Sequence, residues 1–233
     1  MRDDLAIGYW REGEGGAPLL LVHGFPETKR IFARNVAPLA AAGFDVIVPD
    51  LRGVGDSDPA PDGFYDPPAY ARDLRALCAA LGIERCGAVA GDVGAMVVAE
   101  LGLRFPGFVA RQCLFNTLAP PLVAAFAAAG IPEDPPVTER PEMDYFVRQG
   151  SDAEGLLAEL DTPERRRAYV AAMYESAAGQ RGARSRPRTS PITASHSRAP
   201  QHYARRLPST RSDSASGRSP SRPYSRRKIP SPR

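Results

Sequence analysis

Short apolar runs alternate with segments that contain glycine or proline along the first half of the chain. Leu19–Val22 and Asp45–Val48 are too short for helices, and each ends at a turn that glycine or proline imposes. The segment between them, residues 31–42, is rich in alanine with apolar residues at helical spacing. The pattern predicts two buried strands joined by a helix, which is typical of a parallel sheet covered by helices.

The same alternation continues to about residue 116. An amphipathic helix is predicted over residues 69–81, with Gly82 as its stop signal. A third strand is predicted over Cys86–Ala90, a helix over Val93–Arg104, and a fourth strand over Val109–Phe115. These repeated strand-helix units predict an α/β fold with a mostly parallel, doubly wound sheet.

The chain divides into three regions of different character. Residues 1–119 form the predicted core, and residues 120–175 form a partial helical cap inserted over the carboxyl ends of the strands. Within the cap, Thr162 and Pro163 provide a helix start, as a cap followed by a proline in the first turn. Residues 176–233 hold 13 Ser, 13 Arg and 8 Pro. This tail has too few apolar side chains to offset an ordering cost of ~1–2 kcal/mol per residue, so we expect it to be disordered.

The net charge of +3 is the sum of two unlike parts. Residues 1–175 carry 16 Lys and Arg against 26 Asp and Glu, a net of −10, whereas residues 176–233 carry 14 against one, a net of +13. Serine, arginine and proline are also what GC-rich codons encode when they are read out of phase. We therefore interpret the tail as the product of a shifted reading frame, which the nucleotide sequence of the gene would test.

An alternative interpretation makes the tail a nucleic-acid-binding arm on a non-catalytic body. Its positive charges would give salt-sensitive, non-specific binding to nucleic acid. Only two aromatic residues of the tail, Tyr203 and Tyr224, are available to stack on bases. This scarcity favours a small-molecule substrate over a nucleic acid as the partner of the protein.

Composition also bears on the compartment and on cofactors. The three cysteines, Cys78, Cys86 and Cys113, lie among apolar residues, form no C-x-x-C pair, and are predicted to be buried thiols. The N-terminus lacks the apolar stretch of a signal peptide, and no run approaches the ~18 apolar residues that span a bilayer. The sequence predicts a soluble cytoplasmic protein without membrane contact, and no spacing implies a metal or an organic cofactor. It does not predict an oligomeric state.

The candidate chemistry centres on Ala90-Gly91-Asp92-Val93-Gly94, which joins the third strand to the next helix. This is the pattern of a nucleophile elbow, in which small flanking residues let strand and helix approach and one side chain is lifted clear of the sheet. Asp92 occupies that position. A carboxylate there suits attack on a saturated carbon that bears a leaving group, with an ester as the intermediate. The alternative is that Asp92 is only a helix cap.

A second motif, His23-Gly24-Phe25-Pro26, follows the first strand and is predicted to lie beside the elbow. The backbone N–H groups of Phe25 and Val93 would then form an oxyanion hole. His23, with Gly24 and Pro26, is expected to support the loop as a hydrogen-bonded residue rather than as the catalytic base.

A third motif, Gly55-Asp56-Ser57 with Asp58 and Pro59 after it, has some likeness to a serine elbow. No helix is predicted to follow it, because prolines intervene. Ser57 is therefore expected to have a structural role in a loop.

In order and spacing these motifs resemble the α/β-hydrolase superfamily, over about residues 5–175. The elbow aspartate points to the branch that holds epoxide hydrolases and haloalkane dehalogenases. Dehalogenases of this branch usually have Trp after the nucleophile and Asn after His-Gly, where this chain has Val93 and Phe25. The sequence therefore looks more like an epoxide hydrolase, which implies opening of an epoxide to a diol through an ester at Asp92. Carbon–halogen cleavage by the same fold is the alternative.

The resemblance also implies a cap tyrosine that donates a proton or a hydrogen bond to the epoxide oxygen. Tyr145 lies in a segment similar to the family's first cap tyrosine region and is the candidate, with a packing role as the alternative. Neither Tyr169 nor Tyr174 can be assigned as a second such residue.

In this superfamily an acid and a histidine that activate water follow later strands. The only histidines after the elbow are His196 and His202, both in the tail, and neither follows a strand. We expect this copy to lack the last strands of the fold and to be inactive or impaired. Loss of those strands would leave an exposed sheet edge, so we also expect poor solubility.

Overall fold

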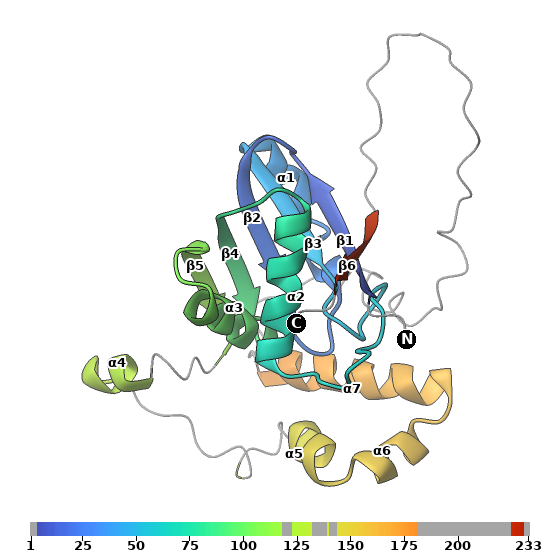
Figure 1. Ribbon diagram of the computed structural model, residues 1–233. Helices are drawn as coiled ribbons and strands as arrows, with labels where there is room; N and C mark the ends of the chain where they lie inside the picture. Colours follow the sequence, from blue (N-terminus) through green and yellow to red (C-terminus); the bar gives the residue numbers. More distant parts are fainter. Residues whose placement is uncertain (1–3, 118–122, 132–138, 140–143, 181–224, 231–233) are drawn as a thin grey trace, which may run out of the picture. The chain divides into compact units, whose positions relative to one another are not determined.

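The computed structural model describes residues 4–117, 123–131, 139, 144–180 and 225–230 (Figure 1). The chain falls into two compact units. The first comprises Met1–Ile131 together with Gly217–Arg233, and the second comprises Pro132–Ser216. The predicted boundary at residue 119 lies outside the described residues.

A six-stranded sheet with the order β5-β4-β2-β3-β1-β6 forms the first unit. Four of its strands run parallel to one another: β2 (Ala17–Val22), β3 (Phe44–Pro49), β4 (Cys86–Gly91) and β5 (Val109–Phe115). All four are predicted from the sequence, and the predicted α/β architecture with a mostly parallel sheet is confirmed.

The remaining two strands are not predicted from the sequence. β1 (Asp4–Glu12) pairs antiparallel with β3, and β6 (Ser225–Pro230) pairs antiparallel with β1. β6 lies within the part of the chain for which the composition predicts disorder. Strand pairing uses backbone N–H and C=O groups, so the exposed edge of β1 can pair with a segment that has few apolar side chains. Residues 181–224 lie outside the described part of the chain.

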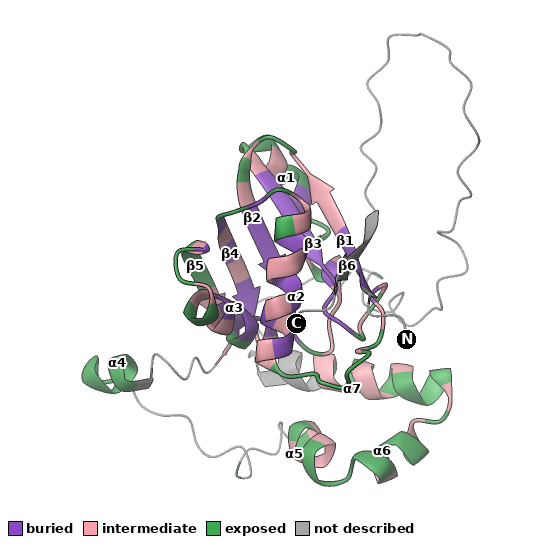
Figure 2. Cartoon of the chain, in the orientation of Figure 1, coloured by how far each residue is buried: buried purple, intermediate pink, exposed green. Residues whose placement is uncertain are grey.

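Both faces of the sheet's centre are covered by helices, as Figure 1 shows. α2 (Pro67–Ala80) and α3 (Val93–Arg104) pack on one face, against Leu20, Val22 and Ile47. α1 (Val36–Ala41) lies on the other, against Leu19, Leu21, Val46 and Val48. Because successive side chains of β2 and β3 point into two apolar layers, these strands are continuous apolar runs rather than alternating ones. They are coloured as buried in Figure 2.

The helix predicted over residues 31–42 is instead two short helices, η1 (Lys29–Phe32) and α1. Thr28 caps η1, because its side chain accepts a hydrogen bond from the N–H of Arg30 at 3.3 Å. Pro38 has no N–H and fits only the first turn of a helix, so α1 begins just before it rather than continuing from η1.

The cysteines are buried at two positions and exposed at the third. Cys78 on α2 and Cys86 on β4 lie in the core as free thiols, whereas Cys113 is exposed. The prediction that Cys113 is buried is therefore wrong. It lies on β5, which is one of the two edge strands of the sheet and has five exposed residues among its seven.

The second unit is helical where it is described, and its assignment as a cap stays a prediction. It contains α5 (Asp144–Ser151), α6 (Ala153–Glu159) and α7 (Pro163–Gln180). The hydroxyl oxygen of Thr162 accepts a hydrogen bond from the N–H of Arg165 at 3.2 Å, so Thr162 caps α7 as expected. α4 (Val123–Ala128) belongs to the first unit. None of the helices described in either unit combines the length and apolar character that crossing a bilayer requires.

Candidate active site

Asp92 lies in the tight turn between the end of β4 and the start of α3. Its backbone has φ 53° and ψ −133°, a conformation that residues other than glycine rarely adopt. Its side chain makes no capping hydrogen bond to α3. Instead, its Oδ1 accepts a hydrogen bond from the backbone N–H of Phe25 at 2.9 Å. Asp92 thus occupies the N-cap position of α3 without a side-chain capping hydrogen bond, and its role as nucleophile or as a residue of the turn stays a prediction.

Two glycines let the elbow approach the loop after β2. A Cβ atom at Gly94 would lie 2.4 Å from the carbonyl oxygen of His23, and one at Gly24 would lie 2.5 Å from the Cβ of Asp92. Both distances are too short for any side chain without movement of the backbone. The pattern of small residues predicted at the elbow thus has a direct steric cause.

β5, which lies next to β4 on the side opposite β2, also contacts the elbow. The N–H of Asp92 donates to the carbonyl oxygen of Phe115 at 3.2 Å. The Phe115 ring packs over Gly91, where a Cβ atom would come within 2.4 Å of it. Asn116, the next residue, has φ 49° and is the second residue other than glycine in the described chain with positive φ. Backbone strain is therefore concentrated at the carboxyl ends of two adjacent strands.

His23 is a buried residue with both ring nitrogens in use. Its Nε2 accepts a hydrogen bond from the N–H of Leu51 at 3.1 Å, so the proton lies on Nδ1, which donates to the carbonyl oxygen of Gly24 at 2.9 Å. Burial lowers the pKa of His23 and keeps the ring neutral. These contacts support the loop, and they leave neither nitrogen for proton transfer at Asp92.

A buried ion pair fastens the same loop to the segment after β3. The N–H of Lys29 donates to Oδ1 of Asp50 at 2.7 Å, and its ammonium group contacts Oδ2 of Asp50. The ammonium group also lies 2.5 Å from Oδ2 of Asp56. Lys29 and Asp50 are 1% and 0% exposed, so this pairing is largely removed from water. Because Lys29 follows the Phe25 loop directly, the pair limits how far that loop can move from Asp92.

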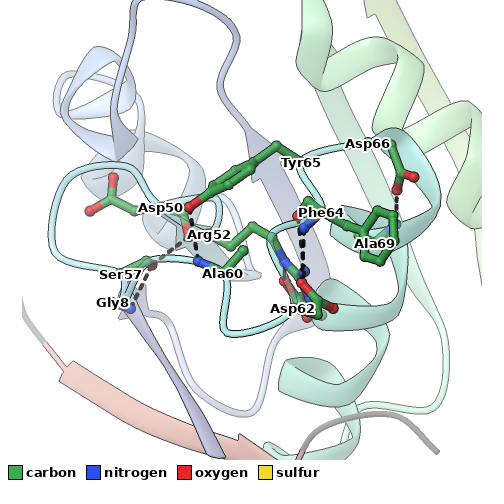
Figure 3. A network of polar contacts seen from close by, with 11 residues as sticks. Gly8, Asp50, Arg52, Ser57, Ala60, Asp62, Phe64, Tyr65, Asp66 and Ala69 are labelled. Carbon is green, nitrogen blue, oxygen red and sulfur yellow. Dashed lines mark hydrogen bonds and ion pairs between the residues drawn. The ribbon is translucent and has the colours of Figure 1, made fainter.

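The segment after β3 is itself held by polar contacts (Figure 3). The hydroxyl of Ser57 donates to the carbonyl oxygen of Asp50 at 2.7 Å and accepts from the N–H of Gly8 at 3.0 Å. Arg52 pairs with Asp73 through two contacts of 2.5 and 2.6 Å. Ser57 is therefore a structural residue, as expected, and not a nucleophile.

Glu27 is a site residue that the sequence reasoning missed. Its Oε2 accepts a hydrogen bond from the N–H of Gly24 at 3.0 Å. Burial raises the pKa of Glu27, and the nearby negative charge of Asp92 raises it further. The available signal was a carboxylate four positions after His23, in a loop already assigned to the site.

The remaining predicted site residues are described by their positions in the chain and in its helices. Val93 follows Asp92 as the first residue of α3, and Pro26 follows Phe25 in the loop. Tyr145 is a half-buried residue of α5 in the second unit, and its assignment stays a prediction. His196 and His202 lie outside the described residues.

Comparison with known proteins relates the sequence of this chain to one family. The profile of the α/β hydrolase fold matches residues 17–228. A soluble epoxide hydrolase from a Corynebacterium species is 44% identical over 82 residues, covering 35% of this chain and 28% of that protein. A fluoroacetate dehalogenase from a Burkholderia species is 42% identical over 110 residues, covering 46% and 36%. Epoxide hydrolase A of Mycobacterium tuberculosis is 34% identical over 142 residues, covering 60% and 40%.

The chain thus spans about a third of the length of the curated relatives it matches. The match of the family profile covers most of the chain, and it includes the elbow and the loop after β2. The chain belongs to the α/β hydrolase fold family.

Proposed function

We propose that Asp92 is the nucleophile of an epoxide-opening reaction. A carboxylate oxygen of Asp92 attacks a ring carbon of the epoxide and the ring C–O bond breaks, which gives an ester of Asp92 and an alkoxide. The alkoxide takes a proton from Tyr145 and becomes a hydroxyl group. In a second step water would attack the ester carbonyl carbon, and the N–H groups of Phe25 and Val93 would stabilise the resulting oxyanion.

The observation that carries this proposal is the hydrogen bond between Oδ1 of Asp92 and the N–H of Phe25, with Asp92 held at positive φ. A strained residue without a capping role is typical of a functional position rather than a structural one. The names of two relatives, a soluble epoxide hydrolase and epoxide hydrolase A, support an epoxide as the electrophile.

We further propose that the ester accumulates in this chain. Hydrolysis of the ester requires a base that activates water. His23 is committed to two hydrogen bonds, and the sequence has only two other histidines, both in the Ser- and Arg-rich tail. The expected behaviour is a single alkylation of Asp92 with little or no steady formation of diol.

The test is intact mass spectrometry of the full chain after incubation with styrene oxide, an aryl epoxide. The wild-type chain is expected to gain one substrate mass, the Asp92→Asn variant none, and a Glu100→Gln control on α3 the same mass as the wild type. Diol formation should be followed in the same samples. Steady diol formation would contradict accumulation of the ester, and the absence of both adduct and diol would contradict the assignment of the nucleophile.

The second candidate function is carbon–halogen cleavage, which the similarity to a fluoroacetate dehalogenase favours. The same carboxylate attack would form an ester and release halide instead of opening a ring. The test is release of fluoride from fluoroacetate, measured with an ion-selective electrode. Stoichiometric release that is lost in Asp92→Asn would favour carbon–halogen cleavage over epoxide opening as the function.

A further inference from the structure

The turn after β2 is closed by two hydrogen bonds between its first residue, Gly24, and its last, Glu27. The N–H of Glu27 donates to the carbonyl oxygen of Gly24 at 3.1 Å, which is the closing bond of a β-turn. In the other direction, the N–H of Gly24 donates to Oε2 of Glu27 at 3.0 Å. The carbonyl oxygen of Gly24 also accepts from the neutral ring of His23 at 2.9 Å. Both backbone groups of Gly24 are therefore held, and Glu27 bonds to each of them.

Two carboxylates use two successive N–H groups of this turn. The N–H of Gly24 donates to Glu27, and the next N–H along the chain, that of Phe25, donates to Oδ1 of Asp92 at 2.9 Å. The backbone of Gly24 also lies against the same carboxylate, because a Cβ atom at Gly24 would be 2.7 Å from Oδ1 of Asp92. A change in the orientation of Gly24 would therefore change how the N–H of Phe25 meets Asp92.

Glu27 is a half-buried carboxylate that interacts electrostatically with Asp92. Burial raises the pKa of Glu27, the backbone hydrogen bond that it accepts lowers this pKa, and the negative charge of Asp92 raises it. Lys29 is close to Glu27 in the sequence, but its ammonium group is bonded to two other carboxylates, those of Asp50 and Asp56. The carboxylates of Glu27 and Asp92 are thus close enough for the charge of one to act on the other.

We propose that Glu27 is a positioning residue for the candidate nucleophile Asp92. Its carboxylate holds the N–H of Gly24 and thereby keeps the following N–H, that of Phe25, directed at Asp92. A buried N–H group that loses its acceptor costs free energy, so the turn would reorient if the carboxylate of Glu27 were removed. This role rests on the proposed function, in which Asp92 is the nucleophile. The alternative is that Glu27 stabilises the turn without any effect on Asp92.

The first test measures the rate at which Asp92 is alkylated by styrene oxide. Time courses of intact mass at several epoxide concentrations give a maximal rate and a half-saturating concentration. Glu27→Ala should lower the maximal rate about 10- to 100-fold and leave the half-saturating concentration unchanged, because it misplaces the nucleophile and not the substrate. Glu27→Gln keeps an acceptor oxygen and should lower the rate only about two- to fivefold, since a neutral hydrogen bond is weaker than a charge-assisted one. Glu100→Ala, on α3, is the control and should react like the wild type.

The second test requires no reaction and follows the amide resonances of Gly24 and Phe25 by nuclear magnetic resonance of the full chain. As the pH falls, the amide proton of Gly24 should move upfield, with a midpoint above the ordinary glutamate pKa of 4.5, because burial favours the neutral carboxyl of Glu27. This step should be absent in Glu27→Gln. At neutral pH, Glu27→Ala should move the amide proton of Phe25 upfield, because its hydrogen bond to Asp92 weakens.

The outcomes separate positioning by Glu27 from a structural role and from the proposed function. The proposal is overturned if Glu27→Ala is alkylated at the wild-type rate, or if the amide of Phe25 is unchanged in that variant, however far its melting temperature falls. If Glu27→Ala does not fold by circular dichroism, the rate and the pH step of Glu27→Gln decide. A wild-type chain without an adduct, combined with the shift of Phe25 in Glu27→Ala, would contradict Asp92 as the nucleophile and uphold the positioning contact.

Discussion

β4 carries Asp92 at its end, and the strands on its two sides differ sharply. On one side, β2 is buried, and the loop after it is fastened by Lys29–Asp50 and by His23–Leu51. On the other side, β5 is mostly exposed and has no described neighbour beyond it. Both sides nevertheless bond to Asp92, through the N–H of Phe25 and the carbonyl of Phe115. The described backbone contacts of Asp92 thus come from both sides of β4, one from a buried region and one from an exposed strand.

The largest expected effect comes from breaking the buried ion pair on the β2 side. Lys29→Met leaves the carboxylate of Asp50 buried without its cation, which should lower the free energy of unfolding by about 3–5 kcal/mol. The matched control is Arg104→Met, which removes the partly exposed pair with Glu100 and should cost about 0–1 kcal/mol. Urea unfolding followed by circular dichroism measures both. Equal losses in the two variants would mean that the loop after β2 is not held by Lys29.

The next effect concerns the close approach of α3 to the loop after β2. Gly94→Ala forces a Cβ atom against the carbonyl of His23 and should destabilise the fold by about 1–3 kcal/mol. Gly102→Ala, in the same helix, places its Cβ atom 3.9 Å from Val109 and should stabilise the fold by up to ~1 kcal/mol. Thermal unfolding of the two variants should therefore shift in opposite directions. A Gly94→Ala variant as stable as wild type would show that the elbow is looser than described.

The smallest effect is a pH dependence from His23. Burial lowers the pKa of His23, so the folded chain keeps the ring neutral while the unfolded chain binds a proton below about pH 6.5. Stability should therefore fall as the pH drops below 6.5, by up to ~1.4 kcal/mol per pH unit from this group.

His23→Gln removes this titration and should give a less stable chain with a flatter dependence on pH between 6.5 and 5. Glu27 acts in the opposite sense, because its raised pKa favours the folded state at acidic pH. The slopes of wild type and variant are therefore compared at the same pH values in urea unfolding. Parallel slopes would contradict a neutral, buried His23.

The strands of the sheet differ in how far they could be predicted from sequence. β2 and β3 are covered on both faces, so each is an apolar run that composition alone reveals. β1 was missed, because it includes Gly8, where a side chain would collide with Asp56 at 2.8 Å. A glycine in the sequence suggests a turn. In the structure, Gly8 lies within the strand, and the loop that contains Asp56 packs too close to the strand for a side chain at this position. β6 is not predicted because Ser225–Pro230 has few apolar residues in its sequence, although its backbone pairs with β1.

In the candidate site too, some features follow from local sequence and others depend on contacts between distant residues. The approach of Asp92 to Phe25 follows from two local motifs whose glycines impose the geometry. The pairing of Lys29 with Asp50 joins residues 21 positions apart, and no local pattern indicates which carboxylate a buried lysine will meet. The position of Tyr145 depends on how a separate unit packs, which periodicity does not determine.

The most direct test of the role of Asp92 is to locate the covalent adduct within the chain. After reaction with styrene oxide and digestion with trypsin, peptide mass spectrometry separates the peptide with Asp92 from the one with Glu27, because several arginines lie between them. We predict a label on the Asp92 peptide, approaching one per chain. A label on the Glu27 peptide, or on neither, would contradict Asp92 as the nucleophile.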